Sequence, residues 1–298
     1  VFDFKNLEEA APNIDKDYIN RKLIYNGAIA WFYDEDGYPI DDYFENDSKV
    51  HYYEGKTFED DIYNDLEMLE FHTKNGEDQV RTLFGSIQVM AEKMFGNYID
   101  GRDRLKKQQM LQCEWIRITF EAHRRNKWFA SGLIYWMLND CWPASNGWSI
   151  IDYYAMPKPA YYSFKRAAKP MITSIENKNG KISVYVCNDS LERCNGRASL
   201  YLYDCKKNEK SFERSFTFDV DANLSEVVFE CDNSEYEKLM SGDALIICDA
   251  ESNLGADRTF YIKGKLADLG IAYKDAEIVS EDEDSITVRA DDHTTLNA

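Results

Sequence analysis

The chain has 298 residues, 44% of them hydrophobic and 14% aromatic, which is enough apolar material for a sizeable core in two or three domains. Its 54 acidic and 35 basic residues give a net charge of −19, which argues against nucleic acid and anionic membranes as partners because both are negatively charged. No stretch approaches the roughly 18 apolar residues of a membrane-spanning helix, and the first five residues lack the basic-then-apolar layout of a signal peptide, so we expect a globular cytoplasmic protein. The first residue, Val1, indicates a processed or excised fragment.

The first 76 residues are rich in acidic and tyrosine side chains and show little periodic pattern. One apolar run, Leu23–Tyr33, predicts a buried strand. The segment Asp34–Gly37 follows it, and Asp-Gly is a strong signal for a turn between two strands. The sequence therefore predicts a hairpin here, with Tyr38–Phe44 as its second strand.

Two helices and a strand are predicted before residue 140. Apolar residues recur at helical spacing over residues 80–94, and Gly96 follows as a C-terminal cap. A second helix is expected over about Arg102–Arg125, with apolar side chains on one face. The apolar run Gly132–Leu138 then predicts a strand that is buried on both faces. A helix followed by such a strand is the repeating unit of a parallel α/β barrel.

After Pro170 the pattern changes to short strands with alternating polar and apolar residues. Asn179–Gly180, Asn195–Gly196 and Asn208 are turn signals between them. About seven such strands in roughly a hundred residues favour an immunoglobulin-like β-sandwich. The clearest runs are Lys181–Val186, Ala198–Tyr203, Phe212–Val220, Glu226–Cys231 and Ala244–Asp249.

The part of the chain after Lys263 is predicted to be a linker and the first strands of a further β domain. Ala276–Val279 and Ser285–Arg289 have the alternating pattern of a first pair of strands. The acidic run Ser280–Asp284 lies between them, and we expect it to be a solvated turn rather than a binding tail.

Cysteine and histidine spacing gives no sign of a metal or cofactor site. The seven cysteines follow no CxxC pattern, so we expect reduced, buried thiols of a cytoplasmic protein, although disulfides among the five C-terminal ones stay open. The four histidines lie far apart and show no metal-ligand spacing, so we predict neither a metal nor a cofactor. These residues are Cys113, Cys141, Cys187, Cys194, Cys205, Cys231, Cys248, His51, His72, His123 and His293.

Aromatic, amide and carboxylate groups gather where the predicted barrel strand ends, which is the chemistry of a sugar pocket. Trp136 presents a flat apolar face to the C–H bonds of a pyranose, and Asn139 offers both donors and acceptors to its hydroxyls. Trp142 and Trp148 bracket a Pro-containing loop that would wall the pocket. We predict Trp136, Asn139 and Trp142 as carbohydrate-binding residues. The alternatives are a core role for Trp136 and loop-fixing hydrogen bonds for Asn139, and Asp140 is expected to be structural.

Residues 115–170 resemble the last barrel strand and exit of glycoside hydrolase family 2, and most closely its β-mannosidases. This resemblance implies a multidomain α/β plus all-β protein: final elements of a (β/α)8 TIM barrel over residues 1–168, an immunoglobulin-like β-sandwich over 169–263, and a linker with the first strands of a further β-sandwich over 264–298. The residues that carry it are Arg124–Asn126, Trp136–Pro143, Trp148–Tyr154, Pro157–Tyr162 and Lys165–Ala167.

Enzymes of this family act with retention, using one glutamate as nucleophile and another as acid/base. The resemblance places the acid/base in an Asn-Glu pair, but the one such pair here, Asn208–Glu209, falls in a sandwich turn and is rejected. Glu35 matches the nucleophile pattern within Phe32–Pro39. Asp34 and Asp36 would raise the pKa of Glu35 by like-charge repulsion, which is unfavourable for a nucleophile, so a simple Asp-Gly turn stays the competing interpretation.

The resemblance thus implies the C-terminal part of a retaining exo-glycosidase that removes terminal β-linked mannose. Because the acid/base and most of a barrel are missing, we expect the chain alone to be inactive, and a homodimer stays open. Related members act on β-glucosamine, β-galactose or β-glucuronic acid, and an acidic pocket would suit the first and repel the last. In a further alternative the chain is a non-catalytic carbohydrate-binding module, with Tyr201 and Tyr203 as a stacking face, although such tyrosines are more often ordinary β-formers.

Overall fold

The computed structural model describes residues 87, 89–141, 144, 147–153, 155–269, 277–281 and 286–289. The chain divides into two compact units. One unit contains Val1–Thr119 and Gly132–Lys165, and the other contains Phe120–Ser131 and Arg166–Ala298. The hairpin predicted near Glu35 lies outside the described residues. The division into three domains stays a prediction.

Both predicted helices are confirmed where the structure describes them. Residues 89–95 are helical, and Gly96 ends this helix with a φ of 86° while its amide donates to the carbonyl of Glu92 at 2.8 Å. Helix α6 spans Gly101–Arg125, and the Asp100 side chain caps it by accepting the Asp103 amide at 2.7 Å. A shorter helix, α7, spans Pro159–Ala167 and begins with a proline, whose missing N–H costs nothing at that position. Within the described part, none of the helices has the length and apolar composition of a membrane span.

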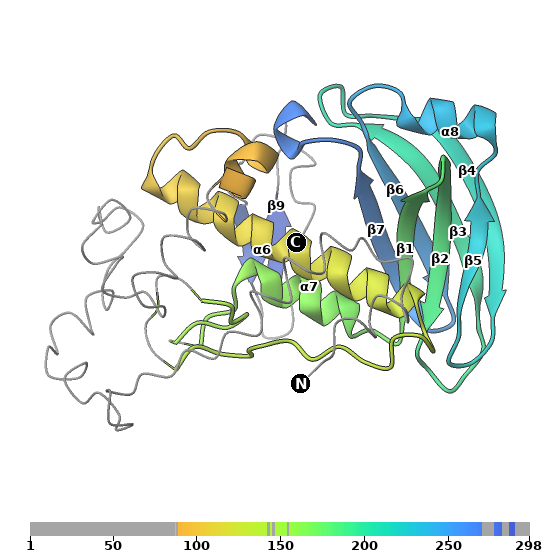
Figure 1. Cartoon of the computed structure of the whole chain (residues 1–298), viewed down its shortest axis with the longest axis horizontal. Coiled ribbons are helices and arrows are strands. Elements are labelled where there is room, and N and C mark those ends of the chain that lie inside the picture. Colours follow the sequence, from red (N-terminus) through yellow and green to blue (C-terminus); the bar gives the residue numbers. More distant parts are fainter. Residues whose placement is uncertain are drawn as a thin grey trace, which may run out of the picture. The chain divides into compact units, whose positions relative to one another are not determined.

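The second unit contains the predicted immunoglobulin-like sandwich. Its seven strands are antiparallel and form a three-stranded sheet in the order β1-β2-β5 and a four-stranded sheet in the order β4-β3-β6-β7 (Figure 1). This is the strand count and sheet division of an immunoglobulin-like domain. The strands are β1 (Met171–Lys178), β2 (Lys181–Asn188), β3 (Cys194–Asp204), β4 (Glu209–Val220), β5 (Ser225–Glu230), β6 (Leu245–Ser252) and β7 (Gly255–Ile262).

The facing sides of the two sheets enclose one apolar core. Val184 of the small sheet and Leu200 and Ile246 of the large sheet are fully buried in it. Burying each such side chain stabilises the fold by roughly 1.5–3 kcal/mol. Phe216 and Phe229 stack with ring centroids 5.1 Å apart and so join β4 to β5 across one edge of the sandwich.

Two of the three predicted turns are confirmed and one is wrong. Asn179 and Gly180 have φ values of 53° and 72° and form the two-residue loop between β1 and β2. Asn208, with a φ of 57°, lies in the turn between β3 and β4. Asn195–Gly196 lies inside β3 instead. A Cβ on Gly196 would stand 2.1 Å from the Glu251 carbonyl oxygen of β6, so the glycine is needed for close strand packing rather than for a turn.

Two elements follow or interrupt the strands. Helix α8 (Asn233–Met240) lies between β5 and β6 in sequence and crosses one end of the sandwich (Figure 1). A short 3-10 helix, η3 (Leu266–Leu269), follows β7. Strands β8 (Glu277–Glu281) and β9 (Ile286–Arg289) then pair antiparallel, which confirms the predicted first pair of strands.

Candidate functional site

The segment predicted as the buried barrel strand, Gly132–Leu138, is not a strand in the structure. Exposed and less exposed residues alternate along it, and Ile134 and Leu138 are 82% and 59% exposed. Among the described residues, strand-like pairing is limited to the end of the segment, where the Leu138 carbonyl accepts from the Ile151 amide at 2.9 Å and Asn139 forms an isolated bridge with Ile151. The prediction of burial on both faces is therefore wrong for the described residues, because an extended apolar run buries both faces only between two neighbouring strands.

Two of the predicted sugar-binding residues lie three positions apart in sequence near the end of this segment, and both are exposed. Trp136 is 45% exposed, which contradicts the alternative that its indole belongs to the core. The Trp136–Met137 peptide bond is cis. Asn139 is exposed, and its side-chain amide donates to the Asp140 carbonyl at 3.2 Å, as expected of a loop-fixing residue. Trp142 and Glu35 lie outside the described residues.

Hydrogen bonds of the Tyr135 side chain anchor this segment. Its hydroxyl donates to the Trp148 carbonyl and accepts from the Gln112 side chain of α6 at 3.1 Å. Gln112 also donates to the carbonyls of Trp148 and Ser149 at 2.9 and 3.2 Å. Burial raises the pKa of Tyr135 and the nearby Asp140 raises it further, so the hydroxyl stays protonated as a donor. No sequence pattern indicates this role for Gln112, which lies outside the predicted apolar face of the helix.

Asp140 fixes the end of the segment. The side chain is fully buried, and its Oδ2 accepts from Lys158 Nζ at 2.9 Å. Lys158 also donates to Ser149 Oγ at 2.8 Å. The Asp140 amide donates to the Ile151 carbonyl at 3.0 Å. Because a buried carboxylate needs a paired cation and further hydrogen bonds, these contacts agree with the structural role expected for Asp140.

These contacts fix the backbone of the segment, which carries the exposed side chains of Trp136 and Asn139. Trp136 offers an apolar surface for stacking, and the Asn139 side-chain oxygen can accept a hydrogen bond from a hydroxyl. A site held through its neighbours loses little conformational entropy when a ligand binds. The arrangement can therefore bind a polyhydroxylated ring, whereas cleavage requires carboxylates that Trp136 and Asn139 do not supply.

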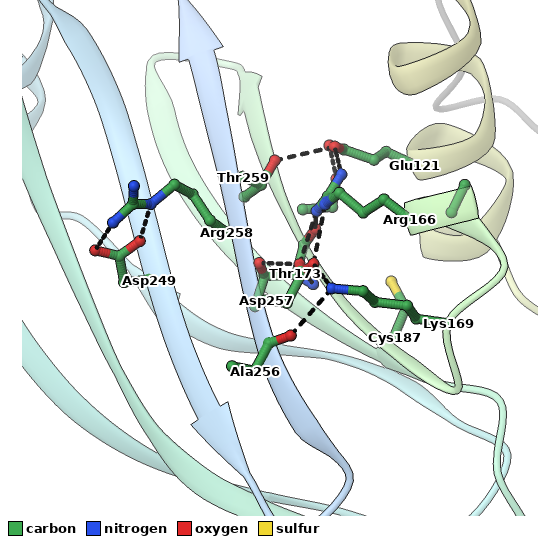
Figure 2. Close-up of polar contacts among 12 residues, drawn as sticks. Glu121, Arg166, Lys169, Thr173, Cys187, Asp249, Ala256, Asp257, Arg258 and Thr259 are labelled. Carbon is green, nitrogen blue, oxygen red and sulfur yellow. Dashed lines mark hydrogen bonds and ion pairs between the residues drawn. The ribbon is translucent and has the colours of Figure 1, made fainter. Parts of the chain in front are cut away.

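A second polar cluster lies in the sandwich unit and centres on Arg166 (Figure 2). The guanidinium donates to Glu121 Oε1 at 2.6 Å and to both oxygens of Asp257 at 2.7 and 2.9 Å. Glu121 and Asp257 are 2% and 6% exposed. Burial alone would lower the pKa of Arg166, but these two carboxylates outweigh it and raise the pKa, so the residue stays charged.

The remaining acceptors of these carboxylates are also used. Ser174 and Thr259 donate to Glu121 at 2.8 and 2.9 Å, and the backbone amide and hydroxyl of Thr173 both donate to Asp257 at 2.8 Å. Carboxylates that are buried, paired and fully hydrogen-bonded are poor nucleophiles and poor acids. This cluster therefore stabilises the sandwich between the edge strands β1 and β7 and is not a catalytic centre.

The tyrosines of the alternative glycan-binding face are covered. Tyr201 and Tyr203 are 2% and 8% exposed, on a strand that lies inside its sheet rather than at an edge. Lys210 Nζ lies 3.9 Å from the centre of the Tyr201 ring, and the Tyr201 hydroxyl donates to Asp249 at 3.0 Å. Burial and Asp249 raise the pKa of Tyr201, so that the hydroxyl keeps this bond. The two rings therefore present no stacking face.

The described residues show no cluster that could hold a metal ion. Their His, Cys, Asp and Glu side chains form no group of three that could hold a metal ion. All seven cysteines are free thiols, and burial raises the pKa of Cys113 and of Cys187 to about 11. Asn208–Glu209 lies in the β3–β4 turn and at the start of β4, as expected from the rejection of this pair as catalytic.

Comparison with known proteins gives a family-model match over most of the sandwich and similarity to several longer proteins. Residues 180–270 match the family model described as a Mannosidase Ig/CBM-like domain. An exo-beta-D-glucosaminidase from Amycolatopsis orientalis is 33% identical over 135 residues, which are 43% of this chain and 13% of that protein. A beta-mannosidase B from Emericella nidulans is 30% identical over 135 residues, 43% of this chain and 15% of that protein. The chain thus aligns with only 13–15% of the length of these relatives.

Two solved structures of similar enzymes resemble this chain in fold. A beta-D-mannosidase from Dictyoglomus thermophilum has a TM-score of 0.57 and 27% identity, covering 68% of this chain and 24% of that one. An exo-chitosanase from Amycolatopsis orientalis has a TM-score of 0.54 over 80% of this chain and 28% of that one. Its 23% identity shows likeness of fold alone.

Proposed function

We propose that this chain is the C-terminal part of a glycoside hydrolase family 2 enzyme and takes part in hydrolysing terminal β-linked mannose, because it is similar to β-mannosidases in sequence and in fold. The proposed reaction proceeds with retention through two carboxylates. The similarity covers a small share of each relative, so the proposal concerns the activity of a whole protein of this kind. We further propose that residues 1–168 contribute barrel elements, with the sandwich and a further β domain after them.

The observation that carries this proposal is that Trp136 and Asn139 are both exposed on one segment, which Tyr135 and Asp140 fix in place. Stacking on an indole favours a sugar ring over most small metabolites, because a pyranose combines an apolar C–H face with polar edges. In this proposal Trp136 lies under the sugar next to the cleaved bond, and Asn139 binds one of its hydroxyls.

The remaining roles are proposed for residues outside the described part. Glu35 is the proposed nucleophile, and Trp142 is the proposed wall of the pocket. The acid/base glutamate is expected to come from sequence that this chain does not contain. Residues 1–298 alone should therefore bind sugar without cleaving it.

A second candidate is hydrolysis of terminal β-linked glucosamine. Two observations favour it: the net charge of −19, which attracts a cationic amino sugar, and the 33% identity to a relative named as an exo-beta-D-glucosaminidase. Both sugars would use the same exposed tryptophan, so the second candidate changes the substrate and not the site.

Calorimetric titration of residues 1–298 with β-linked mannobiose and with the glucosamine disaccharide tests this proposal. Trp136→Ala should weaken binding of the preferred sugar by about tenfold, as expected for the loss of one aromatic contact. Tyr201→Ala serves as the control, because the Tyr201 ring is covered. Equal affinity of the unmodified chain and Trp136→Ala would contradict the site, and turnover of an aryl β-mannoside by the unmodified chain would overturn the prediction of inactivity.

A further inference from the structure

Two adjacent aromatic side chains are exposed on the loop that follows α6 in the sandwich unit. Trp128 is 68% exposed and Phe129 is 67% exposed. Trp128 has a φ of 74°, in the left-handed region that a bulky residue rarely adopts. Such a conformation costs free energy and persists only where the surrounding structure enforces it. Strained backbone conformations cluster at ligand-binding and active sites, so these exposed aromatic side chains are candidates for binding a ligand.

The loop is held by hydrogen bonds that do not involve the two rings. The Asn126 side chain donates to the Ala122 carbonyl at 2.8 Å, and the Asn126 carbonyl accepts from the amides of Phe129 and Ala130 at 3.1 and 2.9 Å. Lys127 ion-pairs with Asp189 on the loop after β2. The backbone at Trp128 and Phe129 is therefore fixed before any ligand arrives, which lowers the entropic cost of binding.

We propose that Trp128 and Phe129 form an aromatic platform that binds a neutral or cationic carbohydrate chain, as a second contact separate from Trp136. Indole and phenyl faces stack on sugar rings and lose little conformational freedom. The net charge of −19 disfavours acidic polysaccharides. The choice of a sugar as ligand rests on the proposed function, but the site does not share any residue with it.

An apolar protein surface is the competing occupant. Leu191, on the same loop as Asp189, is 91% exposed, and a protein partner would cover it together with the two rings. An aliphatic side chain adds little to sugar binding, because it has no flat face to stack on a pyranose. Leu191 therefore separates the two occupants.

The test titrates residues 1–298 with β-1,4-linked mannohexaose and with the glucosamine hexamer. Trp128→Ala and Phe129→Ala should each weaken binding of the hexamer by about tenfold, and Trp128→Leu should weaken it as much, because it keeps an apolar side chain but lacks a ring. Leu191→Ala is the matched control and should leave affinity unchanged. Circular dichroism of each variant verifies folding, and Phe129→Ala keeps the test informative if Trp128 variants fail to fold.

Several results would overturn the platform. One is hexamer affinity that neither Trp128→Ala nor Phe129→Ala lowers, and another is the absence of any hexamer binding at millimolar sugar. A third is self-association in sedimentation that Leu191→Ala and Trp128→Ala both abolish, which would assign the patch to a protein partner. The proposed function fails separately: loss of binding in Trp128→Ala but not in Trp136→Ala supports the platform alone, and the reverse supports the proposed function alone.

Discussion

At the scale of single residues, Arg166 shows how the sandwich tolerates buried charge. It neutralises Glu121 of α6 and Asp257 of β7, two carboxylates that water scarcely reaches. Removing a cation from such a cluster costs more than the pair itself contributes, because the carboxylates would remain buried without a partner. The network therefore ties the last turns of α6 and the end of α7 into the sandwich unit.

Arg166→Met is expected to lower the free energy of unfolding by about 3–5 kcal/mol. Lys169 Nζ lies 3.8 Å from Asp257 Oδ1 and can compensate in part, so we expect the lower end of this range. Urea denaturation followed by circular dichroism measures the change.

Arg258→Met is the matched control for that experiment. Arg258 also binds a carboxylate, Asp249, but on the opposite side of β7 and with its own side chain 62% exposed (Figure 2). Exposed ion pairs contribute about 0–1 kcal/mol. Equal losses of unfolding free energy in both variants would show that the buried Arg166 cluster contributes no more to stability than an exposed ion pair.

At the scale of elements, short-range sequence patterns correctly predicted the helices and turns that short-range interactions determine. The predicted helix Arg102–Arg125 differs from α6 by one residue, and Asn179–Gly180 closes the expected hairpin. Helix α8 was missed, although Asp232 and Glu235 form a capping box that its Asp-x-x-Glu spacing could have indicated. The Gly132–Leu138 strand was wrong because apolar composition says nothing about whether neighbouring strands exist to pair with it.

The candidate site was predicted in part for the same reason. Trp136 and Asn139 could be chosen from their chemistry at the end of an apolar run. The contacts that hold these residues in place could not be predicted from the sequence pattern. Gln112 binds Tyr135 and Lys158 binds Asp140, and these partners lie 23 and 18 residues apart in sequence. Trp128 and Phe129 were missed because exposure of two aromatics depends on what the rest of the fold leaves uncovered.

The capping box of α8 gives a prediction at this scale. Asp232 accepts the Glu235 amide at 2.9 Å, and Glu235 accepts the Asp232 amide at 3.1 Å. Asp232→Ala should lower the Tm of the sandwich by a few degrees, because the Glu235 amide in the first turn loses its side-chain acceptor. Asp243→Ala, which removes an exposed carboxylate outside any cap, should leave Tm nearly unchanged in the same calorimetric scan. A similar Tm for both variants would contradict the role of the cap.

Gly196 gives a second prediction for the sheet. Gly196→Ala should destabilise the protein by about 1–3 kcal/mol or more, because β3 and β6 must separate to admit the new Cβ beside the Glu251 carbonyl. Gly264→Ala is the control, since nothing lies within 4 Å of its Cβ position, and it should be neutral or stabilise by about 0.4–1 kcal/mol. Denaturant midpoints of the two variants measure the difference. A Gly196→Ala protein as stable as the unmodified one would contradict this close packing of β3 against β6.

At the scale of the whole molecule, two electrostatic effects oppose each other as pH falls. The net charge of −19 at pH 7 causes self-repulsion, which weakens towards the isoelectric point of about 4.7. Three aspartates act in the other direction. Backbone hydrogen bonds lower the pKa of Asp204 and of Asp232. Burial alone would raise the pKa of Asp249, but hydrogen bonds and charge from Arg258 outweigh it and lower this pKa as well.

A carboxyl group whose pKa is lower in the folded state stabilises the fold above its unfolded pKa of about 3.9, and this contribution is lost as pH falls through the folded value. Stability should therefore be highest at about pH 5 and should fall below about pH 4. Asp249→Asn removes one contribution at neutral pH. The difference in unfolding free energy between the unmodified protein and Asp249→Asn should consequently shrink as pH falls from about 5 to 2. Urea denaturation at successive pH values measures it, and a difference that stays constant over this range would show that the Asp249–Arg258 pair does not contribute to acid sensitivity.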